Sequence, residues 1–379
     1  MQKEPMNEPE PTFINRLILV GNGFDLAHGM KTRYKDFIFE YLQQCWNTAK
    51  NLYLNRDSIR YVSYYEDELI RITINSPLPN EQHLDIDLKN SQTLKNLLSK
   101  ETNTVSFTGI SFIVSSEFFK TLIINMLDRN WVDIENFYYE KLVNIITPVK
   151  NIYNNPRGEI KTDDLNKLNK SFDFLKMKLE EYLSALEDKP NFNDHLGSLI
   201  YESPFTRGFR IKPLELDKVL ILNFNYTNTP KKYKGQNADI IHIHGELNNE
   251  KNPLIFGYGD ERDETYEKLE KAKVEGVFTH IKSFDYFKTD NYSRLLAFLE
   301  SEFDVYIMGH SCGLSDRTLL STIFEHVNCR YIKIFYHDNA ENYRKTTYEI
   351  SRHFTDKASM RKRVLPITIC KPMPQSKKS

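Results

Sequence analysis

A glycine turn near the start of the chain places the strongest constraint on the fold. The apolar run 17–20 predicts a short buried strand, which leads directly into Gly21-Asn22-Gly23-Phe24-Asp25. Gly21 and Gly23 permit backbone torsions or a close approach that a Cβ would block. A strand, a glycine turn and a helix start together favour an anion such as phosphate. The spacing meets the Gly-x-Gly-x-x-Gly fingerprint only in part, so an unliganded strand-to-helix turn is the alternative.

Four later runs predict the remaining strands. They cover residues 219–225, 240–244, 305–308 and 331–335, and each is short, mostly apolar and followed by a polar turn. Buried runs of this kind are typical of the parallel sheet in a doubly wound α/β fold. We therefore expect a Rossmann-like parallel sheet flanked by helices.

The domain organisation follows from changes in composition along the 379 residues. The sequence predicts a disordered lead-in at residues 1–13 and a basic tail at residues 371–379. Residues 14–44, with an amphipathic helix at 32–42, and residues 216–370 form the Rossmann-like domain. Between them, residues 45–215 lose glycine and show helical periodicity, which predicts a large, mainly helical insert with loops at 75–80 and 151–158. Asp133 and Glu135 fall at a helix start, where acids complement the helix dipole.

Polar turns follow the first four predicted strands. Ligands of such folds bind at the carboxyl ends of the strands, so we expect these turns to form one site. Each turn alone is also compatible with local capping by Asn, Ser or Asp side chains, for instance at Thr227 or Asn228. The candidate residues beyond the glycine turn are Asn223, Asn225, Tyr226, His244, Gly245, Gly309, His310, Ser311 and Asp316.

Composition limits the partners and the compartment. With 51 basic and 52 acidic side chains, no global charge attracts nucleic acid or anionic lipid, and we expect neither as the main ligand. No apolar run of about 18 residues exists, and the first ten residues lack an apolar core, so we expect a cytoplasmic protein. The four cysteines contain no Cys-x-x-Cys pair, which excludes a zinc ribbon.

Several stretches resemble the AbiH-type bacteriophage abortive-infection family, which in turn resembles sirtuin-like NAD-consuming domains. The resemblance covers residues 14–335, with a poorly matched middle. It rests on 18–29 with 34–37, 131–135, 223–227, 243–245 and 309–316.

This resemblance implies a Rossmann-like sheet that binds NAD as a substrate, with the glycine turn near the phosphates. It implies catalytic roles for Asn225 and His244, and nucleotide binding by the other turn residues. Two positions expected to make the ribose contacts differ from those of such domains. Thr227 stands where they carry an acid, and Asn223 stands where they carry a threonine. Because the zinc ribbon of protein deacetylases is missing, water is the expected acceptor. The implied activity is an NAD glycohydrolase that depletes the host pool during infection.

The residue types suit this chemistry. Cleavage of the nicotinamide–ribose bond passes through an oxocarbenium-like centre, so a site needs a base and groups that orient water and ribose hydroxyls. His244 supplies the base and Asn225 the orientation. His242 and His244 lie two apart on a strand and resemble a metal pair, but no third ligand is evident, and we expect no metal.

Two alternatives remain open. Gly309-His310-Ser311-Cys312-Gly313 matches the Gly-x-Ser-x-Gly elbow of serine hydrolases, with Asp338 and His353 following in the required order. Few residues follow Ser311 to complete that fold. In the second alternative, the chain is a nucleotide sensor or a binding module without turnover. Its insert would then contact a phage-derived trigger or a second copy of itself.

Overall fold

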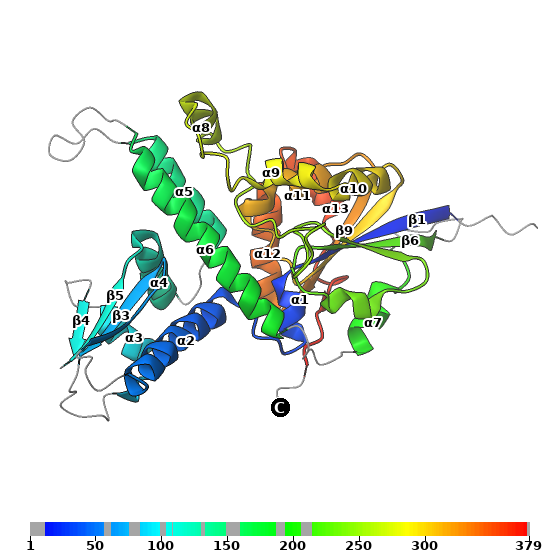
Figure 1. Ribbon diagram of the computed structural model, residues 1–379. Coiled ribbons are helices and arrows are strands. Elements are labelled where there is room, and N and C mark those ends of the chain that lie inside the picture. Colours follow the sequence, from blue (N-terminus) through cyan, green and yellow to red (C-terminus); the bar gives the residue numbers. More distant parts are fainter. Residues whose placement is uncertain are drawn as a thin grey trace, which may run out of the picture.

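A computed structural model describes residues 12–56, 62–75, 84–98, 104–107, 109–129, 133–148, 160–186, 194–205 and 214–376. Within these ranges the chain forms a six-stranded parallel sheet flanked by helices and a separate four-stranded antiparallel sheet. In Figure 1 the helices α5 (Ile134–Ile146) and α6 (Thr162–Leu186) run diagonally between the two sheets. The α/β fold with a Rossmann-like sheet is therefore confirmed.

The parallel sheet contains every strand that the sequence predicted. Its order is β10-β9-β8-β1-β6-β7, and all neighbours are parallel. Read from β7, the chain order is 3-2-1-4-5-6, the order of a Rossmann sheet. The strands are β1 (Thr12–Val20), β6 (Leu214–Asn223), β7 (Ala238–His242), β8 (Phe303–Met308), β9 (Cys329–Tyr336) and β10 (Lys371–Pro372).

Helices cover both faces of this sheet, which explains why its strands are apolar rather than alternating. One face packs a core that includes Leu17, Leu220 and Val305, and the other a core around Ile18, Ile221 and Met308. The helices of this part are α1 (Asn22–Ala27), α8 (Tyr266–Ala272), α9 (Lys282–Asp285), α10 (Asn291–Leu299), α11 (Arg317–Phe324), α12 (Ala340–Arg352) and α13 (Lys357–Arg363), with the 3₁₀ turns η2 (Thr229–Tyr233), η3 (Tyr286–Lys288) and η4 (Leu314–Asp316).

The segment between β1 and β6 is mainly helical, as expected, but it also contains the antiparallel sheet, which was not predicted. That sheet has the order β2-β3-β5-β4. Its strands are β2 (Val62–Glu66), β3 (Ile70–Asn75), β4 (Thr104–Phe107) and β5 (Ile110–Val114). The helices are α2 (Tyr34–Leu54), α3 (Ser91–Leu98), α4 (Glu117–Arg129), α5 (Ile134–Ile146), α6 (Thr162–Leu186) and α7 (Asp194–Ile200).

Three expected boundaries differ from the structure. The predicted helix 32–42 is the first half of α2, so the chain passes residue 44 without a break. Strand β1 begins at Thr12, inside the predicted lead-in, and Lys371 of the predicted tail pairs with Phe335. Residues 1–11 and 377–379, the predicted loop 151–158, and 76–80 of the other predicted loop lie outside the described residues.

Candidate functional site

The glycine turn packs directly against the turn that follows β8. Strands β1 and β8 are neighbours, and the sheet order reverses between them, where ligands of this fold bind. A Cβ at Gly21 would lie 2.6 Å from the His310 Cα atom, and one at Gly23 would lie 2.8 Å from the Gly309 Cα atom. Gly309 itself has φ +76°. These glycines therefore permit a close approach between two segments of protein backbone.

The amides of this turn bond to the protein. Gly21 N–H donates to Met308 O at 3.3 Å, Gly23 N–H to Gly309 O at 2.8 Å, and Phe24 N–H to Gly21 O at 2.8 Å. The side chain of Phe24 is buried against His28 and Tyr233. The proposed phosphate contact of this turn stays a prediction, and it has to use atoms other than these three amides.

The turn after β6 is organised by Asn223. Its Nδ2 atom donates to the Thr227 carbonyl oxygen at 2.9 Å and lies 3.0 Å from His242 Nδ1, and its Oδ1 atom accepts from Asn225 N–H at 3.1 Å. Asn225 Nδ2 in turn donates to the Gly21 carbonyl oxygen at 3.0 Å. The carboxamide of Asn225 is thus held in one orientation at the edge of the sheet.

Thr227 contacts a carboxylate that the glycine turn supplies. Its Oγ1 atom donates to Asp25 Oδ2 at 2.6 Å, and both side chains are buried. The resemblance suggested an acid at position 227. Here the hydroxyl of Thr227 donates to Asp25, and an acid at 227 would face that carboxylate.

Two histidines and an acid from the turns after β7 and β8 meet. The Nε2 atom of His244 lies 3.2 Å from Asp316 Oδ1, and that of His310 lies 3.7 Å from Asp316 Oδ2. The ring of Phe224 contacts both imidazoles, at centroid distances of 5.2 and 4.1 Å. His310 Nδ1 accepts from Cys312 N–H, so its proton lies on Nε2, facing Asp316.

Lys282 and Glu135, which were not among the predicted site residues, complete the cluster. Lys282 Nζ donates to Asp316 Oδ1 at 2.8 Å and to Glu135 Oε2 at 2.9 Å. The Lys282 side chain is only 1% exposed. Asp133 caps α5 by accepting from Asn136 N–H, as a structural acid would, whereas Glu135 points into the cluster and also accepts from Gly257 N–H. We call Glu135, His244, Lys282, His310 and Asp316 the charged cluster.

The charge states in the cluster follow from burial and from the shared lysine. Burial alone would raise the pKa of Asp316, but Lys282 and His244 hold it well below its usual value. Burial alone would lower the pKa of Lys282, but Asp316 and Glu135 raise it. Burial lowers the pKa of His244, and Lys282 lowers it further. At neutral pH the lysine and Asp316 are therefore charged, and His244 is neutral.

Three tyrosines line the same cluster. Tyr286 OH lies 3.3 Å from His244 Nε2, and Tyr226 OH donates to the Ile255 carbonyl oxygen. Burial raises the pKa of Tyr34, Tyr226 and Tyr286, and the nearby carboxyl groups of Glu135 and Asp316 raise it further. All three hydroxyls therefore stay protonated at neutral pH. Tyr34 and Tyr286 were not among the predicted site residues.

Three other predicted residues, Asn22, Ser311 and Gly245, do not belong to the charged cluster. Asn22 accepts from the Thr32 hydroxyl on the surface, and Ser311 is exposed. Gly245 has φ +89°, and a Cβ there would lie 2.2 Å from the Pro253 carbonyl oxygen. Gly245 thus serves the turn that orients His244.

The three residues of a serine-hydrolase triad do not meet. His353 Nε2 bonds to the Cys312 carbonyl oxygen at 2.8 Å, and Asp338 is exposed beside Asn339. The nucleophile of such an elbow sits on a strained turn, but here the positive φ falls on Cys312 rather than on Ser311. The geometry therefore does not favour the serine-hydrolase alternative.

His242 and His244 have different partners. His242 contacts Asn223 and lies 3.6 Å from Glu246, whereas His244 faces Asp316. In the part of the chain that the structure describes, no group of three or more His, Cys, Asp or Glu side chains could hold a metal ion. None of the described helices is long and apolar enough to cross a membrane.

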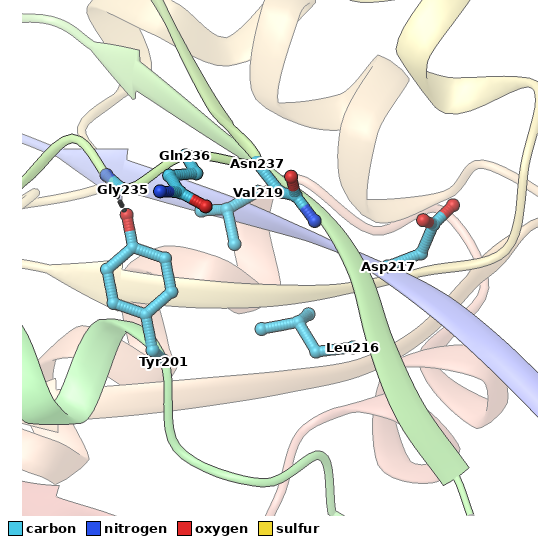
Figure 2. A pocket seen from close by; sticks show the side chains of 7 residues that line it. All are labelled: Tyr201, Leu216, Asp217, Val219, Gly235, Gln236 and Asn237. Atoms are coloured by element: carbon cyan, nitrogen blue, oxygen red, sulfur yellow. Dashed lines mark hydrogen bonds between the residues drawn. The ribbon is translucent and has the colours of Figure 1, made fainter.

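A hollow of about 360 Å³ lies at the amino-terminal end of β6, at the opposite edge of the sheet from the charged cluster. Figure 2 shows its lining, where Tyr201 OH accepts from Gly235 N–H. Asp217 is its one charged lining residue. The lining contains no histidine and no cation, and we assign this hollow no catalytic role.

Taken together, the sheet order and the charged cluster at its carboxyl edge define a Rossmann-like protein with a composite polar site. The model of the family described as bacteriophage abortive infection AbiH matches residues 17–338. The chain therefore belongs to the AbiH family, which indicates a role in phage abortive infection. No curated protein and no solved structure matches the chain.

Proposed function

We propose that this protein is an abortive-infection effector that hydrolyses the nicotinamide–ribose bond of NAD at the charged cluster. The observation that carries the proposal is the pair formed by His244 and Asp316 at the carboxyl edge of a Rossmann-like sheet. A neutral imidazole accepts a proton, and an ionised carboxylate stabilises the imidazolium that results. Family membership supports the biological setting but not the substrate.

The reaction assigns a role to each group. The bond between ribose C1′ and the pyridinium nitrogen breaks, and its electron pair neutralises the departing nicotinamide. Water adds to C1′ and gives its proton to His244, so the products are ADP-ribose, nicotinamide and a proton. The ionised Asp316 favours the positive charge that develops on the ribose. Asn225, held by Gly21, orients the water or a ribose hydroxyl.

The test is release of nicotinamide from NAD by the purified protein, with infected-cell lysate added as a source of trigger. We expect His244→Ala and Asn225→Ala to reduce release at least about 100-fold, as loss of a general base or an orienting group does. His337→Ala, at an exposed histidine after β9, is the matched control and should retain activity.

The other two functions predict different results. A serine hydrolase would lose all activity in Ser311→Ala and would cleave simple esters. A sensor would bind a nucleotide without releasing nicotinamide under any condition. Release that His244→Ala leaves unchanged would contradict the proposed site.

A further inference from the structure

The charged cluster joins two parts of the fold that are far apart in the chain. Glu135 lies on α5, in the segment between β1 and β6, whereas Lys282 and Asp316 belong to the segments around β7 and β8. In Figure 1, α5 runs alongside the parallel sheet domain rather than within it. A single ammonium group bridges the two parts, because Lys282 Nζ bonds both carboxylates.

The ammonium group of Lys282 therefore interacts with two carboxylates. When Glu135 is ionised, it neutralises part of this positive charge and so weakens the effect of Lys282 on Asp316 and on the imidazole of His244. We propose that Glu135 is a positioning residue of the site, acting through Lys282 on Asp316 and His244. The inference rests on the proposed function only for its effect on activity, since the ion-pair chain exists whatever the substrate.

Ionisable groups from several elements surround Glu135 and His244, the two ends of this chain of ion pairs. The ionisable groups that face Glu135 are Tyr34 of α2, Asp133 at the N-cap of α5, Tyr226 after β6, Lys282 of α9, Tyr286 of η3 and Asp316 of η4. Those that face His244 are Lys282, Tyr286, His310 and Asp316. Lys282 and Asp316 connect the two sets as a direct chain of ion pairs.

Burial raises the pKa of Glu135 to about 7, against the opposing effect of Lys282. Protonation of Glu135 near neutral pH leaves the charge of Lys282 less neutralised. That charge disfavours an imidazolium at His244. Loss of the Glu135 charge should therefore lower the pKa of His244, and loss of Lys282 should raise it.

The experiment is a double-mutant cycle read by NMR of labelled histidine side chains, with His244→Ala used to assign the signal. We expect Glu135→Gln to lower the pKa of His244 by about 0.5 or more, and Lys282→Met to raise it. In the Lys282→Met background, Glu135→Gln should have no further effect, because the connecting cation is gone and Glu135, buried without that cation, is itself protonated. Glu140→Gln, at an exposed position of α5, is the matched control and should leave His244 unchanged.

Two outcomes would overturn the inference. Glu135→Gln without any shift would show that Glu135 does not act on His244, and an equal shift in both backgrounds would show that Lys282 does not transmit it. Should Lys282→Met fail to fold by circular dichroism, the Glu135→Gln arm alone still decides the first point. These results do not depend on NAD turnover, so absence of turnover counts only against the proposed function.

Discussion

Lys282 and Asp316 form a buried ion pair, with Lys282 Nζ 2.8 Å from Asp316 Oδ1. The same oxygen of Asp316 lies 3.2 Å from His244 Nε2. The carboxylate of Asp316 thus contacts both the ammonium group of Lys282 and the imidazole of His244. We therefore expect the stability of the site and its proposed chemistry to depend on the same contact.

Lys282→Met should destabilise the protein, because it leaves two buried carboxyl groups without their cation. We expect the free energy of unfolding to fall by about 3 kcal/mol in urea denaturation at pH 7. Lys288→Met removes an exposed cation that pairs with Asp285 and should cost less than about 1 kcal/mol. Equal effects of the two substitutions would argue against a buried charged cluster.

Gly309→Ala should be poorly tolerated, because φ is +76° there and the new Cβ would lie 2.1 Å from the Phe24 amide nitrogen. A loss of at least about 2 kcal/mol is expected in thermal or urea unfolding. Gly313→Ala, in the same loop, is the control, since its Cβ would lie 3.8 Å from the nearest atom. A Gly309→Ala protein as stable as the Gly313→Ala protein would mean that the two turns do not pack together.

Thr227→Asp should place a second carboxylate beside Asp25 and lower the free energy of unfolding by about 2–4 kcal/mol at pH 7. The loss should shrink at pH 5, because protonation of one carboxyl relieves the repulsion. Thr227→Ser keeps the hydroxyl and should stay within about 1 kcal/mol of the parent. A stable Thr227→Asp protein would instead fit the arrangement that the resemblance to sirtuin-like domains suggested.

Acid should destabilise the fold through its buried histidines. Burial lowers the pKa of His242 and of His310 to about 4, below the usual value of 6.5. Between these values the unfolded chain binds more protons, so stability falls as the pH drops from 6.5 towards 4, by up to ~3 kcal/mol for each residue. Urea midpoints measured at pH 7.5 and pH 5 test this, and equal midpoints would contradict it.

The parallel sheet could be predicted because its strands are buried on both faces. Such strands appear as short apolar runs, and the polar turns after them fall at one edge by topology alone. The antiparallel sheet was missed although Ile70, Ile72 and Ile74 alternate with polar residues. That period of two was the available signal, but the helical periodicity on either side of it favours a helical interpretation of the whole segment.

Of the charged cluster, the sequence selected only residues of the turns that follow strands, which are His244, His310 and Asp316. Lys282 could not be selected in this way, because it lies on a short helix after an irregular segment, and nothing local distinguishes a buried lysine from a surface one. Glu135 was assigned to a helix start, and the position of Asp133 beside it satisfies that signal. Which of two nearby acids points inward depends on tertiary packing.

The most direct test of the central claim is the NAD content of phage-infected cells that express either the wild-type protein or His244→Ala, because infection supplies the trigger. We expect NAD to fall after infection only with the wild-type protein, together with protection of the culture. Protection by the wild-type protein while NAD stays at the level of His244→Ala cells would contradict NAD hydrolysis as its activity.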